Sequence, residues 1–475
     1  MRAYLASSIG VACAAALVLP LPLALPASAA PAAPAASGTS AAPAGEAAVP
    51  GSTQSLPLAA LPSERATGAA RQGLTRRDVR PFSLVGVVWD DPDAELHGSV
   101  QVRTRATGGH TWSGWQSVET HNHDHAADPG TPERDSGTVR GSTAPLWVGA
   151  SDGVEVRVQA EAPRSGGTPA ALPRGMRIEL VDPGDEPSSE AAPAEPASED
   201  TAQGPEIPEG NDTGTTTGQV PAPAPVLTPE ESAASAVNAE LVPLGAAEIP
   251  ELSKAETEAA YADQFGDEAM AAKPHIGPRP RIITRKGWGA DERLRERNFV
   301  YTKSVQAAFL HHSATGNNYN CKQAPSVLRS IYRYHVKSSG WRDFGYNFAV
   351  DKCGNIYEGR AGGVAKAVLG AHTRGFNTNS MGIAVLGTYS QSSPPAAAVT
   401  AVARLTAWKL GLYGKDPRAK TTLTSGGGNR YKKGAKVKLN VISGHRDGFL
   451  TDCPGTRLYG KLGSARSASA KYQGR

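Results

Sequence analysis

Two short stretches of the chain hold side chains that could bind a catalytic metal. In "FLHHSATG" (309–316) two histidines follow an apolar run, and in "ISGHRDGFLTDCPG" (442–455) His445 and Cys453 stand close together. Histidine nitrogen and cysteine sulfur are ligands that zinc prefers, and a catalytic zinc keeps three protein ligands with one position open to water. A His-His pair can equally be structural or solvated, so these residues alone leave both interpretations open.

The cysteine count bears on the same question. Apart from Cys13, near the N-terminus, the chain has Cys321, Cys353 and Cys453, an odd number for an oxidising compartment. Cys453 could form a disulfide. Alternatively, Cys321 and Cys353, which flank an expected helix and strand, form the disulfide and leave Cys453 free to bind a metal. A free thiol on an exported protein is a liability unless something binds it.

The first 30 residues, "MRAYLASSIGVACAAALVLPLPLALPASAA", predict a signal peptide. Arg2 precedes an apolar run that ends in Ala27-Ser28-Ala29, which suits a signal peptidase. A membrane-spanning helix fits less well, because three prolines interrupt the run and no stop-transfer charges follow. We therefore expect an exported protein that is secreted or associated with the cell wall.

The net charge of +4 hides a strong asymmetry along the chain. Residues 182–268 contain about twenty acidic residues against one basic residue, Lys254, whereas residues 273–475 contain about 34 basic and nine acidic residues. The excess of positive charge in residues 273–475 favours binding to a polyanion. Nucleic acid, anionic lipid and an anionic cell wall all qualify on charge alone.

Composition divides the chain into folded and unfolded parts. Residues 31–77 read as a disordered Ala/Pro-rich leader, and residues 183–273 as an acidic low-complexity linker. Between them, residues 78–182 carry six short runs with alternating apolar and polar residues, such as "SVQVRTRA", separated by Gly, Asp and Pro. This pattern predicts an all-β, sandwich-like domain in which nothing catalytic stands out.

The last block, residues 279–462, mixes strands and helices. Strand-like runs at 306–312, 346–351, 382–389 and 439–445 alternate with amphipathic helix patterns at 324–340 and 394–414. We expect an α/β domain with a central mixed β-sheet flanked by helices, followed by a basic tail at 463–475. The Lys-rich insert within 415–438 reads as a solvated loop whose lysines could hold wall phosphates.

Five motifs of this block occur in the order found in one family. "RKGWGADE", "FLHHSATG", "GWRDFGYNFAVDKCGNIYEGR", "GAHTRGFNTNSMGIAVLGTY" and "ISGHRDGFLTDCPG" together resemble the peptidoglycan recognition protein family, which is similar to the type 2 N-acetylmuramoyl-L-alanine amidases. The β-block and the linker resemble regions of secreted actinobacterial members. The resemblance implies the type 2 amidase fold for residues 279–462.

The resemblance also implies roles for individual residues. His311, His445 and Cys453 match the zinc ligands, with one Zn²⁺ per chain and His312 as a supporting residue. Tyr346 and Thr451 match active-site positions. Tyr346 would donate a hydrogen bond to the oxyanion that develops during hydrolysis, and Thr451, Tyr346 or water would relay the proton. The full ligand set implies an active enzyme.

Other residues are expected to line the substrate groove or to pack. The resemblance favours substrate contact by His372, with Asn377, Asn379, Arg360 and Trp341 as further groove residues. His335, on the apolar face of its helix, is expected to pack. "THNHDHAAD" (120–128) holds His121, His123 and His125, but it lies in a Gly/Pro/Asp-rich stretch, and we expect solvated histidines there rather than a metal site.

These expectations combine into one hypothesis about function. The protein would be a secreted zinc amidase that cuts between N-acetylmuramic acid and L-alanine of peptidoglycan, as a monomer, with anionic wall polymers as further partners and with no nucleic acid and no membrane span. The alternative is a non-catalytic peptidoglycan-binding protein. The β-block would either target the enzyme or act as a pro-region that restrains it.

Overall fold

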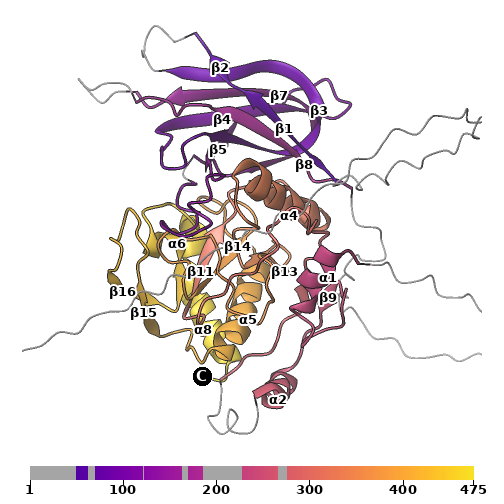
Figure 1. Ribbon diagram of the computed structural model, residues 1–475, viewed down its shortest axis with the longest axis vertical. Helices are drawn as coiled ribbons and strands as arrows, with labels where there is room; N and C mark the ends of the chain where they lie inside the picture. Colours follow the sequence, from indigo (N-terminus) through magenta and orange to yellow (C-terminus); the bar gives the residue numbers. More distant parts are fainter. Residues whose placement is uncertain (1–49, 63–69, 121, 163–169, 186–226, 266–274) are drawn as a thin grey trace, which may run out of the picture. The chain divides into compact units, whose positions relative to one another are not determined.

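The computed structural model describes residues 50–62, 70–120, 122–162, 170–185, 227–265 and 275–475 (Figure 1). The predicted signal peptide, His121, most of the predicted leader and the middle of the predicted linker lie outside these residues. Val49–Arg475 form one compact unit. None of the helices in the described ranges is long and apolar enough to cross a membrane.

The N-terminal part of the described chain consists of strands, as predicted. Eight strands form one hydrogen-bonded sheet in the order β1-β8-β3-β7-β4-β5, with β2 and β6 also paired to β3. Their bounds are β1 Ser52–Pro57, β2 Ala59–Ala60, β3 Arg71–Trp89, β4 Gly98–Ala106, β5 Gln116–Val118, β6 Gly141–Ser142, β7 Leu146–Ala160 and β8 Arg177–Asp182. We call residues 50–185 the β-domain.

The two longest strands hold this sheet together. β3 pairs antiparallel with β7 along most of its length and with β8 near its end, and register shifts interrupt the β3–β7 ladder. The alternating residues predicted from the sequence supply the core, because Val100 and Val102 of β4 are buried with Val156 of β7 and Ile178 of β8. Residues of both halves of the sheet therefore enclose one apolar core, as in sandwich packing.

The structure corrects the predicted leader. β1, β2 and the start of β3 lie inside residues 31–77, and β1 pairs in register with β8 from Ser52 opposite Asp182 to Pro57 opposite Arg177. Ala- and Pro-rich composition suggested disorder, but an edge strand needs only one buried neighbour and tolerates such residues.

The C-terminal part is the predicted α/β domain. Seven strands form a mixed sheet in the order β17-β11-β14-β12-β13-β10-β9. The central strands β17, β11, β14 and β12 run parallel, while β12–β13 and β9–β10 are antiparallel pairs. Their bounds are β9 Glu248–Ile249, β10 Ile282–Ile283, β11 Ala307–His312, β12 Phe348–Val350, β13 Ile356–Glu358, β14 Ser380–Val385 and β17 Ile442–Gly444.

Helices cover both faces of this sheet. Helices α5 (Ala396–Leu412) and α8 (Leu462–Tyr472) bury apolar residues in one core with Leu310 and Ile383, and α4 (Ala324–Arg333) packs in a second core with Ala349 and Ala384. Because side chains alternate along a strand, neighbouring residues such as Ile383 and Ala384 enter different cores. The domain therefore has three layers (Figure 1).

Two segments predicted to be unstructured are folded, and the basic tail is a helix. The linker range contains α1 (Pro229–Ala236), β9 and α2 (Lys254–Phe265), and β9 extends the sheet. The Lys-rich insert forms a hairpin of β15 (Lys420–Thr424) and β16 (Lys436–Asn440), and the basic tail is α8. Buried Leu423 and Leu439 in the hairpin and Ala465 in α8 provide the apolar contacts that composition and charge concealed.

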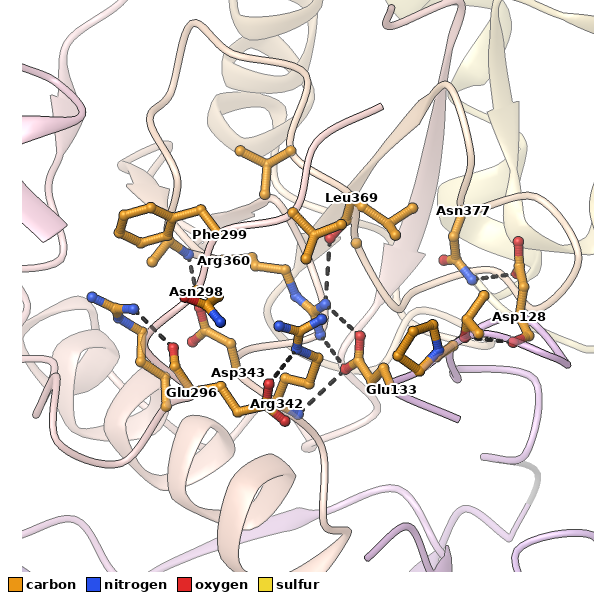
Figure 2. A pocket seen from close by; sticks show the side chains of 18 residues that line it. Asp128, Glu133, Glu296, Asn298, Phe299, Arg342, Asp343, Arg360, Leu369 and Asn377 are labelled. Carbon is orange, nitrogen blue, oxygen red and sulfur yellow. Dashed lines mark hydrogen bonds and ion pairs between the residues drawn. The ribbon is translucent and has the colours of Figure 1, made fainter. Parts of the chain in front are cut away.

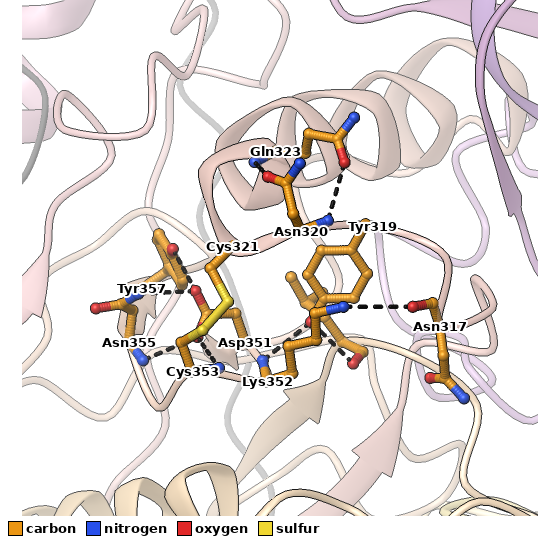
Figure 3. Close-up of a disulfide and its surroundings, with 11 residues drawn as sticks. Asn317, Tyr319, Asn320, Cys321, Gln323, Asp351, Lys352, Cys353, Asn355 and Tyr357 are labelled. Carbon is orange, nitrogen blue, oxygen red and sulfur yellow. Dashed lines mark hydrogen bonds between the residues drawn. A yellow bond between two sulfur atoms is a disulfide. The ribbon is translucent and has the colours of Figure 1, made fainter. Parts of the chain in front are cut away.

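A disulfide joins Cys321 and Cys353, leaving Cys453 as the free, buried cysteine. The bond ties the turn before α4 to the turn after β12, where Asp351 accepts hydrogen bonds from the backbone of Cys353 and Asn355 (Figure 3). The predicted pairing is confirmed.

The two domains share an apolar core. Leu84, Val88, Trp147 and Val181 of the β-domain are buried together with aromatic residues of the α/β domain, among them Tyr334. The Tyr334 hydroxyl donates to the Thr143 carbonyl at 3.1 Å, and a Cβ at Gly86 would lie 2.3 Å from that hydroxyl. Glycine at position 86 is thus required for the close approach of the two domains.

Candidate metal centre

Two neighbouring parallel strands place the first two histidines. His311 is near the carboxyl end of β11, and His445 follows β17 directly, at the start of the short helix α6 (His445–Gly448). β11 and β17 pair in parallel, with Leu310 opposite Gly444. Carboxyl ends of adjacent parallel strands meet at one edge of the sheet, so the fold itself brings these two imidazoles together.

Cys453 arrives on the loop that follows α6. Its backbone N–H donates to the Thr451 hydroxyl at 3.1 Å, and its carbonyl accepts from the Arg446 backbone N–H at 3.0 Å. These bonds fold the loop back over α6. The thiol consequently lies beside the two histidines, with Sγ 3.7 Å from His311 Nδ1.

A fourth side chain joins this cluster from the β-domain. His125 lies in the stretch between β5 and β6, and its Nε2 is 3.6 Å from Cys453 Sγ. The ligand atoms of His125, His311, His445 and Cys453 all lie within 4.8 Å of one another, and all four residues are buried. The sequence-based expectation of a solvated histidine at position 125 is wrong, because the α/β domain buries it.

Asp124 orients the added histidine. Its carboxylate is fully buried and lies 2.9 Å from His125 Nδ1, while its other oxygen lies 3.7 Å from His445 Nδ1. A carboxylate on the remote nitrogen of an imidazole fixes the ring and directs the other nitrogen to a metal. The adjacent Asp-His pair in "NHDHA" was the sequence signal for this arrangement.

Burial sets the protonation of the cluster. Burial and the neighbouring histidines lower the pKa of His311 well below its ordinary value, and burial lowers the pKa of His445 to about 3. Both imidazoles are therefore neutral at pH 7, the form that binds metals. Burial raises the pKa of the Cys453 thiol, so its deprotonation needs a nearby cation.

The donor set fits zinc. Three imidazole nitrogens and one thiolate are a borderline-soft set of the kind that Zn²⁺ takes in tetrahedral sites. His445 Nε2 is buried and has no hydrogen-bond partner within the described parts of the chain. Four buried donor atoms within 4.8 Å of one another are typical of a metal site.

Tyr346 and Thr451 lie beside this cluster. The Tyr346 ring centroid is 5.3 Å from that of His311 and 5.8 Å from that of His125. Burial, together with the charges of Cys453 and Asp124, raises the pKa of Tyr346, so its hydroxyl stays a donor at neutral pH. The Thr451 hydroxyl interacts with Asp124 and accepts from the backbone of Cys453.

The remaining histidines have the supporting positions that were expected. His312 lies on the opposite face of β11 from His311, where its Nδ1 accepts from the Tyr389 backbone N–H at 3.3 Å. Its own backbone N–H supports the Cys453 sulfur. His335 stacks on Trp341 with ring centroids 4.4 Å apart, which agrees with the packing role predicted for it.

His372 and Asn377 form a closed turn rather than an open wall. His372 is fully buried with its ring 5.3 Å from His311, and its Nε2 has no hydrogen-bond partner among the described residues. The Asn377 side chain accepts from the backbone N–H groups of His372 and Thr373. It also donates to the Ala126 carbonyl and to Asp128 of the β-domain.

Arg360 and Trp341 are also covered. The Arg360 guanidinium forms two 2.8 Å hydrogen bonds with the Glu133 carboxylate, and both side chains are buried (Figure 2). Trp341 is 6% exposed. Three of the predicted groove residues, Asn377, Arg360 and Trp341, thus lie near the metal cluster but face protein instead of solvent.

Asn379 lies away from the His/Cys cluster. β11 and β14 run parallel from Ala307 opposite Ser380 to His312 opposite Val385, so Asn379 is at the end of the sheet away from His311. Its side chain accepts from the Ser304 backbone N–H, and its φ is +59°. Asn379 shapes the turn into β14, a position that favours asparagine, and its predicted substrate contact stays a prediction.

Comparison with known proteins gives a family match for each of the two parts of the chain. Residues 301–456 match the N-acetylmuramoyl-L-alanine amidase family, and residues 36–201 match the family described as Rv3811 N-terminal galactose-binding domain-like. Peptidoglycan-recognition protein SC2 of Drosophila melanogaster is 31% identical over 183 residues, which cover 38% of this chain and 84% of that protein. The chain belongs to the peptidoglycan recognition protein family.

Other relatives agree with this membership. The human N-acetylmuramoyl-L-alanine amidase is 30% identical over 206 residues, 43% of this chain and 30% of that protein. Among solved structures, Drosophila PGRP-LB is 26% identical with a TM-score of 0.31, over 38% of this chain and 92% of that one. The family match and Peptidoglycan-recognition protein SC2 confirm the resemblance seen in the five sequence motifs, and the mixed sheet of the α/β domain is seen in the structure itself.

Proposed function

We propose that this protein is a zinc-dependent N-acetylmuramoyl-L-alanine amidase that cleaves the amide bond between N-acetylmuramic acid and L-alanine in peptidoglycan. The observation that carries the proposal is the convergence of His311, His445 and Cys453 beside Tyr346 in a domain of this family. His311, His445 and Cys453 would hold one Zn²⁺ per chain, which supplies an activated water and polarises the scissile carbonyl.

The protein's own side chains would stabilise the transition state and transfer the proton. Tyr346 is placed to donate a hydrogen bond to the carbonyl oxygen as negative charge develops there, a contact worth roughly 3 kcal/mol in comparable sites. Thr373 Oγ1 lies 3.3 Å from His311 Nε2 and fixes the imidazole with Nδ1 toward the cluster. Thr451, next to Asp124 and Cys453, is the side chain best placed to pass a proton to the leaving amine.

We also propose that the protein acts outside the cell, at the wall. The signal peptide predicted from the first 30 residues and the Cys321–Cys353 disulfide support this location, since disulfides persist in oxidising compartments. The basic charge of residues 273–475 supports binding to an anionic wall.

The test combines metal content with hydrolysis. Purified protein should contain about one zinc per chain. His445→Ala and Cys453→Ala should each abolish the release of stem peptides from murein and lower the zinc content, while His110→Ala, at an exposed histidine, should change neither. A Cys453→Ala protein that digests murein as fast as the wild type would overturn the zinc mechanism.

One observation favours the alternative of a non-catalytic peptidoglycan-binding protein. With His125 the cluster offers four protein ligands, the number found in closed structural zinc sites. A protein with that function should bind zinc tightly and should bind murein. Neither the wild type nor any His125 variant should release stem peptides.

A further inference from the structure

The segment from Asn122 to Glu133 of the β-domain, here called the plug, covers the metal centre and its surroundings. Its first two residues contact the β-domain, Asn122 through Ser142 and His123 through Glu95, whereas groups from Asp124 to Glu133 bond to the α/β domain. The Asp124 carbonyl accepts from the Arg374 backbone N–H at 2.9 Å, and the Ala126 carbonyl accepts from Asn377 at 2.8 Å. From Asp124 to Glu133 the plug is therefore hydrogen-bonded to the α/β domain at several points.

The middle of the plug is anchored by a carboxylate. Asp128 Oδ1 accepts from the Gly375 backbone N–H at 2.8 Å and from the Asn377 side chain at 2.6 Å. Asp128 is 7% exposed. Burial raises the pKa of this carboxyl, and the two hydrogen bonds that it accepts fix the plug against the 372–377 turn.

The end of the plug is anchored by a second carboxylate. Glu133 makes the bidentate pair with Arg360 and also accepts from the Arg342 backbone N–H at 3.3 Å (Figure 2). Figure 2 shows the Asp128 carboxylate beside Asn377 and the Glu133 carboxylate beside Arg360. Two residues predicted to contact substrate, Asn377 and Arg360, have carboxylates of the plug as their partners.

Little space remains at the metal centre itself. The cavity lined by His125, Tyr346, Thr451 and Cys453 has a volume of about 10 Å³, which is about the room that one water molecule needs. A muramyl peptide cannot enter it. The plug thus places His125 in the cluster and carboxylates on the groove residues Asn377 and Arg360. An inhibitor that belongs to the same chain would be bound in this way.

We propose that the plug keeps the enzyme latent: His125 occupies the fourth coordination position of the metal in place of water, and Asp128 and Glu133 take the polar partners that substrate would use. This proposal rests on the proposed amidase function and adds its regulation. The plug must leave the groove before peptidoglycan can bind. The stretch that follows it, Asp135–Thr138, is exposed, so the strand connection to β6 can be reached by an activating protein or protease.

The experiment uses the full chain with cobalt in place of zinc, because Co²⁺ reports its ligands by visible absorption. The probe for an open coordination position is azide. His125→Ala removes the proposed ligand, and His123→Ala is the matched control, since His123 belongs to the plug but not to the cluster. Azide should leave the spectra of the wild type and His123→Ala unchanged and should shift that of His125→Ala.

Hydrolysis of murein by the zinc-loaded proteins supplies the second readout. His125→Ala should release stem peptides at least about tenfold faster than the wild type, because more of the molecules have an accessible site. His123→Ala should stay within about twofold of the wild type. A wild-type protein whose cobalt spectrum responds to azide as strongly as that of His125→Ala would overturn the proposal.

The two proposals fail in different ways. A His125→Ala protein that binds azide but digests no murein would support His125 as a ligand and overturn the amidase function. A wild-type protein that digests murein as fast as His125→Ala would support the amidase and overturn latency. If circular dichroism shows that His125→Ala is unfolded, Asp128→Ala is the variant to use instead, because it keeps all four ligands. Asp128→Ala should hydrolyse murein faster than the wild type. An unchanged rate would contradict the proposed role of the plug.

Discussion

Asp124 and Glu133 show how single side chains carry the contact between the two domains. Both carboxylates are buried, and each faces a cationic or imidazole partner on the α/β domain. A buried charge persists only when it is paired and hydrogen-bonded. The acidic residues of this loop, which look like ordinary solvated residues in the sequence, are thus its main attachment points.

Breaking the buried pair between Glu133 and Arg360 should cost stability. Burial by itself would raise the pKa of Glu133, but the Arg360 charge and its hydrogen bonds outweigh burial and hold the pKa below its ordinary value. Glu133→Gln should lower the free energy of unfolding by about 3 kcal/mol at pH 7, measured by urea denaturation. Asp416→Asn, which breaks an exposed pair with Arg418, should change it by less than about 1 kcal/mol.

The same pair makes a pH prediction with a definite sign. Because the folded-state pKa of Glu133 is depressed, its contribution to stability is present above the pKa of the unfolded chain and is lost as the pH falls through the folded-state pKa. The difference between wild type and Glu133→Gln should therefore shrink on acidification below about pH 4.5. An equal difference at pH 7 and pH 3 would contradict the assignment.

At the level of elements, the site depends on strand ends and on the turns that hold them. β11 and β17 bring His311 and His445 to one edge, and the disulfide secures the turn that leads into α4, whose C-terminal extension carries His335 and packs near Tyr346. The disulfide is on the same domain but away from the metal cluster, so its role is to stabilise the fold.

Removal of the disulfide should therefore lower stability without changing the chemistry. The bond closes a loop with a sequence separation of 32 residues, for which loop-closure entropy gives roughly 3 to 4 kcal/mol. The double variant Cys321→Ser/Cys353→Ser should unfold at correspondingly lower urea concentration, and a reducing agent should shift the wild type but not the variant. Zinc content should remain unchanged, and its loss would show that the turn supports the metal site.

At the level of the whole molecule, the β-domain and the α/β domain do not behave as independent modules. Leu84 and Trp147 from one and Tyr334 from the other are buried in a common apolar core. Such an interface resembles the interior of one domain more than a transient contact between two. Neither part would cover its apolar face alone.

This shared core predicts a single unfolding transition. Leu84 is fully buried, and Leu84→Ala should lower the stability by about 2 to 5 kcal/mol. Calorimetry of the full chain should show one transition that moves as a whole to lower temperature. Two transitions, of which only one moves, would show that the domains unfold separately.

The sequence predicted His311, His445 and Cys453 of the candidate metal centre better than the segment that covers them. His311, His445 and Cys453 stand in motifs whose order along the chain already indicated their convergence at strand ends. His125 does not, because its burial depends on contacts with residues about 190 or more positions away, which no local pattern records. The Asp124–His125 pair was a readable signal, but the surrounding Gly and Pro residues favoured a solvated loop.

Composition also concealed parts of the fold. The stretch "LTPEESAASA" in the predicted linker contains a complete helix start, with Thr228 as N-cap, Pro229 in the first turn and Glu231 completing a capping box. The high Ala, Pro and Glu content outweighed that local signal. Asn238, just after α1, donates to both oxygens of buried Glu358, so this segment is part of the α/β domain.

The plug is continuous with the β-domain at both of its ends, between β5 and β6. An inhibitor attached in this way competes at a fixed effective concentration, set by the chain that carries it and not by the amount of protein in solution. Dilution of the protein therefore does not release the plug from the groove. Activation must therefore come from an event on the molecule itself, so the rate of peptidoglycan cleavage would follow how many molecules have been opened rather than how many are present.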